Sequence, residues 1–503
     1  METKPNLKEI QKQLDEAKAI EPPKTMKELK DRIYQAGEQW RSENAKVVGE
    51  ENDLGVKIPL PPIHTVAKAL SEIATFTFIT KSNTPDKSQL YLYDLDEGIY
   101  TASMDEFNVL CMKFDNRIKP NEWKQIYLMV RTMTKIRRPL ESPTLVPVKN
   151  GIIDLESKEL LPFAPEYIIT SKIATEYKIR KESPKDREGN TFDDWLSSIA
   201  CGDDEIITLL WQIMLEAINP NYTRSKFAIL YGDGNNGKGT FQRLLINLIG
   251  ESNVSALKPA QFSDKFSLES LVGKVCNIGD EAPNEYLKNP SDLMSVTSGD
   301  TVLINPKGKP VYEATLKLFN IFSGNYIPNG GNKTKGWYRR IMIVPFNADF
   351  NGEVEKPWIK NEFLADKNVL EYVLYKTINQ KPFSRFIEPK VVKDLLKDYQ
   401  EENDYILSFV KNEYIPNGWH ELEAVPIFLV NSRLREYAED MGIQKPSVYG
   451  AGKTIAKHLK DLTGNKYIVK KHRAKASDLE TLDPYEFERK KLKESRDCIY
   501  KLE

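Results

Sequence analysis

The chain has 503 residues, of which 40% are hydrophobic and 29% are charged. This composition excludes a collagen-like, disulfide-rich or largely disordered protein, and the length suggests about three or four domains. The 72 Lys and Arg residues nearly balance the 73 Asp and Glu residues, so any affinity for nucleic acid must come from local basic patches. No apolar run reaches about 18 residues, which argues against a membrane-spanning segment.

The four cysteines, Cys111, Cys201, Cys276 and Cys498, are far apart and form no CxxC pair. This spacing argues against structural zinc or a disulfide framework and favours a reducing compartment. The charged N-terminus lacks the apolar stretch of a signal peptide. We therefore expect a cytoplasmic protein, in a bacterial host, with no membrane partner.

The first part of the chain predicts a helical N-terminal extension and linker over residues 1–62, with the Gly- and Pro-rich stretch 50–62 as the linker. A mixed α/β region, 63–200, follows. Within it, residues 90–100 alternate like a β-hairpin and residues 121–136 have the pattern of a helix.

Asp94 and Asp96 lie in the turn of this predicted hairpin and form a DxD pair that could hold a metal. Acidic residues are also common in turns because their side chains bond to nearby backbone groups. The turn interpretation is favoured because it explains both residues fully.

The middle of the chain, 201–350, predicts an α/β domain. Residues 203–219 have the pattern of an amphipathic helix, and residues 226–346 alternate short apolar strands with helical stretches. A polar helical region, 351–423, follows as a lid or linker. The chain then reaches a small C-terminal module within 424–503.

The segment with the clearest chemistry is a glycine-rich loop between an apolar strand, 227–231, and an amphipathic helix. The loop fits GxxxxGK and consists of Gly232, Asp233, Gly234, Asn235, Asn236, Gly237 and Lys238. Its glycines let backbone N–H groups surround a phosphate, and the helix N-terminus adds its positive dipole end. Lys238 would reach the β- and γ-phosphates. The strand–loop–helix context favours a nucleotide site over a plain turn.

One residue departs from the usual form of this loop. Gly239 stands where Ser or Thr normally follows the lysine, and a hydroxyl comes one residue later, at Thr240. Either Thr240 binds Mg²⁺ from a shifted position or a water replaces it. A second fragment, 450–454, mimics the end of such a loop, but it lacks the first glycine and a preceding strand. We interpret it as a loop that enters a helix.

Two carboxylates, Asp280 and Glu281, end the apolar stretch 274–279. Phosphoryl chemistry needs one acid to hold Mg²⁺ and a second to polarise the attacking water. Asp280 suits the first role and Glu281 the second. An acidic turn is the alternative.

Two further polar sites flank the next strands. Asn325 ends an apolar stretch and could orient water beside a γ-phosphate, although alone it is equally typical of a turn. Arg339 and Arg340 come directly before another strand. Paired arginines are usually solvated or salt-bridged, but in a nucleotide motor they can act as a finger on a neighbouring subunit's nucleotide.

Five motifs therefore follow in order: GDGNNGKGT, NIGDE, SGDTVLINPKGKP, FSGNYIPN and WYRRIMIVPF. Their order and spacing resemble the core of superfamily 3 AAA+ helicases, and most of all the primase-helicases of phages, plasmids and large DNA viruses. The segments 145–177 and 391–410 are similar to those that flank the motor in these proteins. The resemblance covers about 60–415.

This resemblance implies a hexameric ring that hydrolyses ATP with Mg²⁺ and pulls single-stranded DNA through its centre. It assigns phosphate binding to Lys238, Mg²⁺ and water to Asp280 and Glu281, and the sensor role to Asn325. Arg339, Arg340 or both would be the finger that acts in trans.

A pore hairpin that grips DNA lies between the acidic pair and the sensor in the family, and here it maps to residues 298–312. Lys307 and Lys309 would flank its tip, where phosphate contact suits them, and a solvated turn is the alternative. Many relatives also carry a primase domain ahead of the motor. Only about 60 residues precede the resemblance here, so we expect a separate primase.

The C-terminal module reads as two helices and a turn into a short strand, and it resembles a winged helix. It gathers a local basic surface that includes Lys453, Lys457, Lys470, Lys471 and Arg473. Such a surface is what contacts to a DNA backbone need, although it could also face solvent or another protein.

Together these patterns predict an α/β fold: an AAA+ P-loop motor with a mixed α/β N-terminal collar and a C-terminal helical, winged-helix module. The expected function is an ATP-dependent replicative helicase of a phage or mobile element that acts on single-stranded and forked DNA. The alternatives are an origin-binding initiator that melts DNA and a nucleotide-gated DNA-binding or assembly protein that does not translocate. A small-molecule kinase is disfavoured by the arginine pair and the basic C-terminus.

Overall fold

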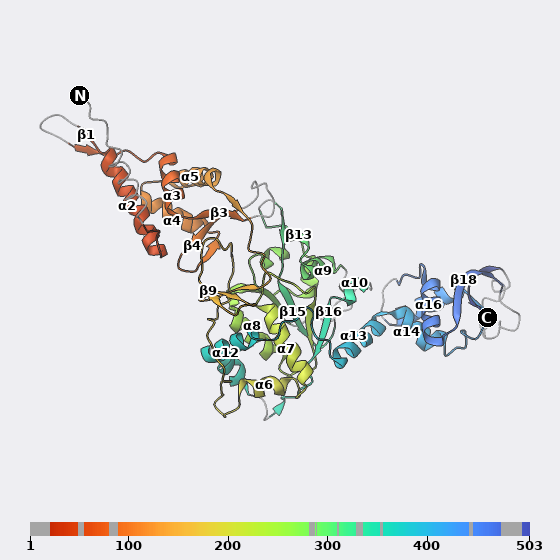
Figure 1. The fold of residues 1–503 in the computed structure, drawn as a ribbon. Helices are drawn as coiled ribbons and strands as arrows, with labels where there is room; N and C mark the ends of the chain where they lie inside the picture. Colours follow the sequence, from red (N-terminus) through yellow and green to blue (C-terminus); the bar gives the residue numbers. More distant parts are fainter. Residues whose placement is uncertain are drawn as a thin grey trace. The chain divides into compact units, whose positions relative to one another are not determined.

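A computed structural model describes residues 21–48, 55–79, 89–280, 287, 289–308, 311–327, 335–352, 356–441, 446–473 and 495–502 (Figure 1). The chain forms two compact units. The first comprises Met1–Pro283, Pro290–Tyr326 and Val344–Ile387, and the second comprises Asn284–Asn289, Ile327–Ile343 and Glu388–Glu503. Within the described residues, no helix is both long enough and apolar enough to cross a bilayer.

The first unit begins with four helices packed with a small sheet. The helices are α2 (Met26–Asn44), α3 (Ile63–Ile73), α4 (Met104–Phe114) and α5 (Pro120–Met133). The sheet has the order β5-β4-β3-β6, formed by Ile99–Thr101, Leu90–Asp94, Phe76–Ile79 and Ile136–Arg137. The predicted hairpin at 90–100 and the predicted helix at 121–136 are confirmed.

Helix α2 packs into the same core as the helices after residue 62. The Thr25 hydroxyl caps α2 by accepting a hydrogen bond from the Glu28 amide. Its buried Leu29 and Ile33 belong to one cluster with residues of α3 to α5. A Cβ at Gly37 would lie 1.9 Å from the Phe114 carbonyl oxygen, so only glycine permits this close approach of α2 and α4.

The packing therefore shows no division at residue 62, where we predicted a domain boundary. The predicted linker also contains regular structure, because β1 (Lys46–Val48) pairs antiparallel with β2 (Gly55–Lys57). In the β4–β5 turn, Asp94 Oδ1 accepts hydrogen bonds from the Asp96 and Glu97 amides. These hydrogen bonds are those of a turn, as the turn interpretation expects.

A three-stranded antiparallel sheet and a short helix lead to the central domain. The strands are β7 (Leu145–Val148), β8 (Gly151–Asp154) and β9 (Leu160–Leu161), and the helix is α6 (Phe192–Ile199). The Phe192 ring lies 5.9 Å from the rings of both Trp211 and Tyr372. Helix α6 thus packs with helices of the motor region, across the boundary predicted at residue 200.

The central sheet has five strands in the order β11-β12-β15-β10-β16. They are formed by Val254–Ser255, Cys276–Gly279, Phe319–Gly324, Phe227–Tyr231 and Ile341–Pro345. Strand β15 pairs parallel with both β12 and β10. The α/β prediction is confirmed. Since parallel strands direct their carboxyl ends to one edge, the segments after β10, β12 and β15 meet there.

Helices α7 (Asp204–Ala217), α8 (Lys238–Ile249) and α12 (Lys367–Ile378) pack with this sheet and with one another. We predicted that α7 is amphipathic, but every residue from Leu209 to Ala217 is buried. The reason is that α7 contacts β15 and α12. Because α12 also contacts α8, residues up to Ile387 pack with the central α/β domain rather than forming a separate lid.

Several short elements connect these parts. They are the 3-10 helices Glu251–Asn253, Pro259–Ser263, Ser267–Leu271 and Phe363–Ala365, helices α9 (Ser291–Ser298), α10 (Lys335–Tyr338) and α11 (Pro357–Asn361), and strands β13 (Thr301–Ile304) and β14 (Tyr312–Thr315).

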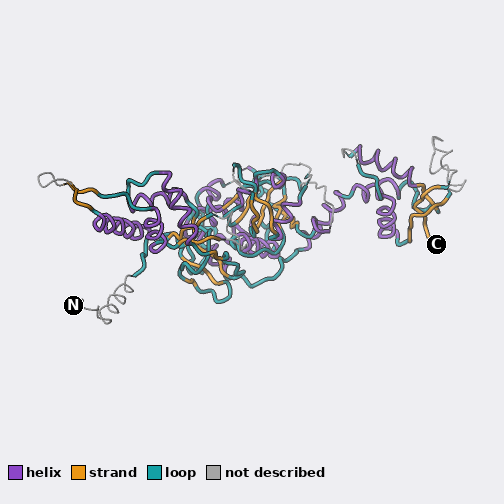
Figure 2. The backbone as a smooth tube through the Cα atoms, turned by 90° about the horizontal axis from the view of Figure 1, so that it is seen from above, coloured by secondary structure: helices purple, strands orange, loops and turns teal. Residues whose placement is uncertain are grey.

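The second unit contains α13 (Lys390–Asn403), α14 (Tyr405–Phe409), a π-helical turn (Val410–Tyr414), α15 (Ile427–Asp440) and α16 (Ala451–Thr463). Its antiparallel sheet has the order β17-β19-β18, formed by Ala424–Pro426, Arg496–Leu502 and Lys466–His472. Figure 2 shows the helices beside these strands. The predicted order of two helices and a strand is confirmed, whereas β19 was not predicted.

Candidate nucleotide-binding site and basic surfaces

The glycine-rich loop has the backbone shape that its glycines permit. Gly237 precedes α8 in the left-handed region with φ +89°, and Gly232 has φ +156°. A Cβ at Gly232 would lie 2.2 Å from the Phe346 carbonyl oxygen, whereas one at Gly234 would meet nothing within 4 Å. The structure therefore requires glycine at the first position of the loop and at Gly237, but has room for a side chain at Gly234.

Residues that follow β16 hold this loop in place. The Asn236 amide group donates to the Phe346 carbonyl at 2.7 Å, and the Phe350 backbone amide donates to the Asn235 carbonyl at 2.9 Å. The Asn235 side chain also donates to Asn351 Oδ1 at 3.0 Å. These hydrogen bonds hold the loop against the segment that follows β16.

The loop lysine lies at the centre of this arrangement. Lys238 is buried, and its Nζ donates to the carbonyl oxygens of Gly232 at 2.5 Å and Asp233 at 2.6 Å. It also donates to Asn236 Oδ1 at 3.0 Å and to Asn325 Oδ1 at 3.3 Å. The structure therefore brings together the lysine and the asparagine that the sequence placed 87 residues apart.

Asp280 reaches the same edge from β12. The Ser323 hydroxyl donates to Asp280 Oδ1 at 2.8 Å, and Ser323 lies two residues before Asn325. Sequence reasoning missed Ser323. The available signal was its position two residues before Asn325, near the end of the same predicted strand. Glu281, the predicted partner of Asp280, lies outside the described residues.

The predicted ligands of the metal ion are Thr240 and Asp280. Gly239 and Thr240 form the first turn of α8, with Gly239 exposed and the Thr240 side chain partly buried. Asp280 is exposed at the strand end. A hydroxyl and a carboxylate are oxygen ligands of the type that Mg²⁺ prefers, so Thr240 and Asp280 stay the predicted ligands of that ion.

The predicted pore segment is a β-hairpin. Strands β13 and β14 pair antiparallel from Thr301↔Thr315 to Ile304↔Tyr312. Lys307 is exposed in the turn, next to Gly308 with φ +74°. Lys309, the second lysine of this prediction, lies outside the described residues.

The paired arginines have different environments. Arg339 is exposed, whereas Arg340 is buried and donates to the Gly336 carbonyl at 2.7 Å. In the second unit, α10 is further fixed by a hydrogen bond from Trp337 Nε1 to Tyr399 Oη at 3.3 Å. Of the two side chains, only Arg339 is presented to solvent.

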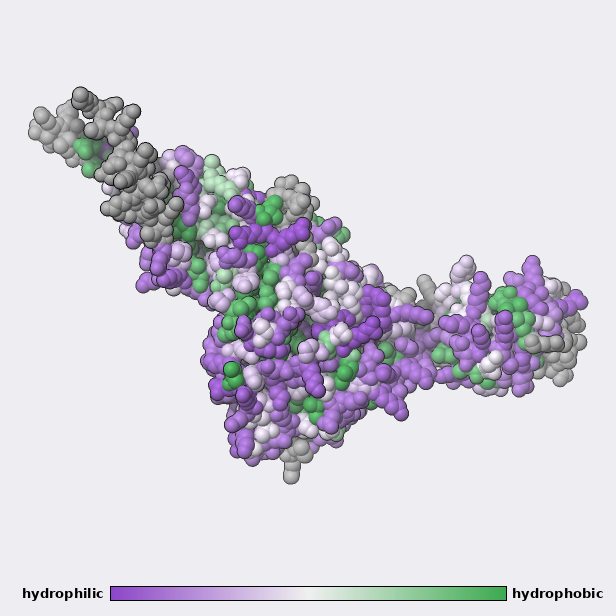
Figure 3. Space-filling view, viewed as in Figure 1, coloured by the Kyte–Doolittle hydropathy of each residue, from purple (hydrophilic) through white to green (hydrophobic). Residues whose placement is uncertain are grey.

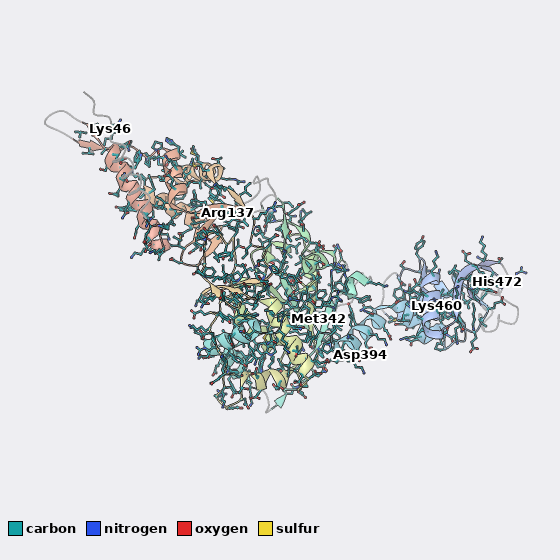
Figure 4. All side chains as sticks on the ribbon, viewed as in Figure 1. Lys46, Arg137, Met342, Asp394, Lys460 and His472 are labelled. Carbon is teal, nitrogen blue, oxygen red and sulfur yellow. The ribbon has the colours of Figure 1, made fainter. Side chains whose placement is uncertain are left out.

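The basic residues of the C-terminal module separate into two groups. Lys453, Lys457 and Lys460 are exposed on one face of α16, opposite its buried Ile455 and Leu459. We call these three the lysine stripe (Figure 4 labels Lys460). None of them makes an ion pair with a described residue, and the surface of this module in Figure 3 is mostly hydrophilic.

The other group lies at the end of β18 and directly after it. The Lys470 ammonium lies 3.0 Å from the centre of the Tyr500 ring, so part of its charge is engaged in a cation–π contact. Lys471 and Arg473 are exposed. As predicted, residues 450–454 enter a helix: Gly450, with φ +73°, precedes α16.

Sequence reasoning also missed an aromatic side chain beside the lysine stripe. Tyr449 is 97% exposed, four residues before Lys453. A fully exposed ring next to lysines is the combination with which proteins stack on bases and track a backbone. No sequence pattern distinguishes it from a packed tyrosine.

Comparison with known proteins finds similarity in two parts of the chain. Residues 116–201 match a family described as D5 N terminal like. Residues 230–340, which include the loop lysine, Asp280 and Asn325, match a family of unknown function, DUF5906. The first match overlaps the segment that the sequence assigns to the region ahead of the motor.

Solved structures give a more distant similarity. The A form apo structure of the NrS-1 C-terminal region is 14% identical, with a TM-score of 0.48, and the alignment covers 88% of this chain and 99% of that one. A second apo structure of the same region has the same identity and TM-score and is covered to 98%. This likeness is too distant to assign a fold or an activity.

Proposed function

We propose that this chain is an ATP-dependent replicative DNA helicase of a phage or mobile genetic element, built on an AAA+ motor of the superfamily 3 type. The observation that carries the proposal is the convergence of Lys238, Asp280 and Asn325 at one edge of a parallel sheet. The D5 N-terminal-like match supports a relation to phage-type primase-helicases.

In this proposal the loop binds ATP. A bound Mg²⁺ ion would neutralise part of the phosphate charge. Lys238 exchanges its present oxygen partners for phosphate oxygens. Thr240 and Asp280 hold the ion, Ser323 orients Asp280, and Asn325 positions water next to the transferred phosphate. Glu281 polarises that water.

The active form is a ring, with six subunits as the proposed number. Arg339, rather than the buried Arg340, extends to the neighbouring subunit's nucleotide as the finger. The β13–β14 hairpin carries Lys307 along the backbone of single-stranded DNA, while the lysine stripe and Tyr449 hold DNA outside the motor.

The test is ATP-dependent strand displacement on a forked DNA duplex, with Lys238→Ala beside the wild type. We expect unwinding by the wild type alone. An exposed lysine of the first unit provides a matched control, since Lys265→Ala should unwind as the wild type does. Absence of DNA-stimulated ATP hydrolysis in the wild type would contradict the proposal.

A second candidate is an origin-binding initiator, which the lysine stripe of the C-terminal module favours. Sequence-selective duplex binding that disappears when residues 424–503 are removed would support it, particularly if the wild type hydrolyses ATP without unwinding. A Glu281→Gln variant that keeps full function would instead support a nucleotide-gated protein that does not translocate.

A further inference from the structure

Helix α11 lies against the helix that follows the glycine-rich loop, and nothing in the loop motif predicts this contact. Residues of α11 contact α8, and the 3-10 helix Phe363–Ala365 contacts it as well. The Asn247 side chain in α8 donates to the Leu364 carbonyl at 3.0 Å. Two successive turns of chain are therefore attached to one side of α8.

The position of α11 is fixed by its own anchors. Trp358 is buried, and the Arg187 guanidinium lies 4.3 Å from the centre of its ring. Lys356, just before α11, forms an ion pair with Glu188. Because α11 is held at both of these points, its remaining side chains have a defined place beside α8.

One of those side chains, Lys360, lies at the loop's unusual position. Its Nζ is 3.7 Å from the place that a Cβ of residue 239 would occupy. Lys360 is exposed and makes no ion pair with a described residue. An ammonium group therefore lies within van der Waals distance of the point where the usual Ser or Thr side chain of the motif would begin.

We propose that Lys360 is a second cationic contact for the phosphates of the nucleotide bound by the loop. The inference deepens the proposed function and rests on it. Gly239 lacks the hydroxyl that normally follows the loop lysine, and the Lys360 ammonium lies beside this position. Lys360 is thus a binding residue for a nucleoside polyphosphate, contributed by a segment far from the motif.

The test measures the affinity of the full chain for a fluorescent ATP analogue under conditions without DNA. A hydrogen bond to a charged group contributes about 1.5–3 kcal/mol, which is about 10- to 100-fold in affinity. We expect Lys360→Ala to weaken binding by about tenfold or more, and Lys360→Arg to retain most of it. The loss should shrink as salt rises, because the group is exposed.

Lys381→Ala is the matched control, since Lys381 is another exposed lysine of the same unit; its affinity should equal that of the wild type. Melting temperatures of the unliganded variants confirm that each folds. Wild-type affinity in Lys360→Ala would overturn this inference while leaving the proposed function intact. Failure of the wild type itself to bind the analogue would instead contradict the proposed function.

Discussion

The two units carry their positive charges in opposite ways. In the first unit, Lys238 is buried among oxygen atoms that fix its position, and Arg224 is enclosed by Glu216 and the Phe383 ring. In the second unit, the lysine stripe stands in solvent on a helix face. A cation that acts on one defined phosphate needs a fixed position, whereas cations that follow a backbone need only exposure and spacing.

This comparison predicts that buried cations held by several partners affect catalysis or folding when removed, whereas the lysine stripe affects DNA affinity alone. The arginine pair allows the sharpest test, because Arg339 is exposed and its neighbour Arg340 is buried, in the turn directly after α10. Arg339→Ala should fold normally but lower ATP hydrolysis by about 10³-fold or more, as expected for a finger that acts in trans. Arg340→Ala should lower the melting temperature.

Mixing subunits distinguishes a trans finger from a local role. Lys238→Ala subunits keep a working Arg339, and Arg339→Ala subunits keep a working loop. A mixture of the two inactive proteins should therefore regain part of the ATP hydrolysis. If the mixture stays inactive while both variants assemble, Arg339 does not act across a subunit interface.

The second largest effect should follow from Arg224. Its ion pair with Glu216 is buried, and burial raises the pKa of Glu216 against the opposing effect of Arg224. Removing one partner of a buried pair costs about 3–5 kcal/mol. We expect Arg224→Ala to lower the free energy of unfolding by this amount in urea denaturation. Arg243→Ala, from an exposed pair with Glu251, should cost less than about 1 kcal/mol.

The sequence predicted that the loop lysine, Asp280 and Asn325 come to one edge of the sheet, and this is confirmed because the signals are local. The loop, Asp280 and Asn325 each follow a short apolar strand, and parallel strands bring such ends together. What it missed depends on packing between distant segments. Three such contacts are α2 with the core of α3 to α5, α12 with α7, and Lys360 with the position of Gly239. Each joins residues that are far apart in the sequence, so no local sequence pattern predicts it.

Substitution of the lysine stripe should have a smaller effect, and only on DNA binding. Changing Lys453, Lys457 and Lys460 together to Gln should weaken single-strand binding and reduce its salt dependence by about two, because each lost phosphate contact accounts for about 0.7 of the slope. The melting temperature should not change. The same substitution at Lys390, Lys393 and Lys397, exposed on α13, is the control. If both triple variants lost the same DNA affinity, the cause would be the change in net charge and not the position of the lysine stripe.

The smallest effect concerns a carboxylate that ties α12 to the segment ahead of the motor. Burial alone would raise the pKa of Glu371, but hydrogen bonds from Lys178 and Arg180 outweigh it and lower the pKa below 4.5. Its contribution to stability is therefore complete above about pH 4.5 and is lost as the pH falls towards the folded-state pKa. The melting temperature of Glu371→Gln should fall less steeply than that of the wild type below pH 4.5.

Glu251→Gln, which alters an exposed pair, should follow the wild-type curve. Parallel curves for Glu371→Gln and the wild type would show that the carboxylate is equally protonated in the folded and unfolded chains, contrary to the lowered pKa.

The strand order of the C-terminal sheet also constrains how this module forms during synthesis. Strands β17 and β18 do not pair with each other, because β19 lies between them and pairs with both. Both strands are therefore synthesised before β19, the strand with which each of them pairs among the described residues. The basic helix α16 emerges in the same interval, so the module can reach its folded form only after residues 496–502 have followed.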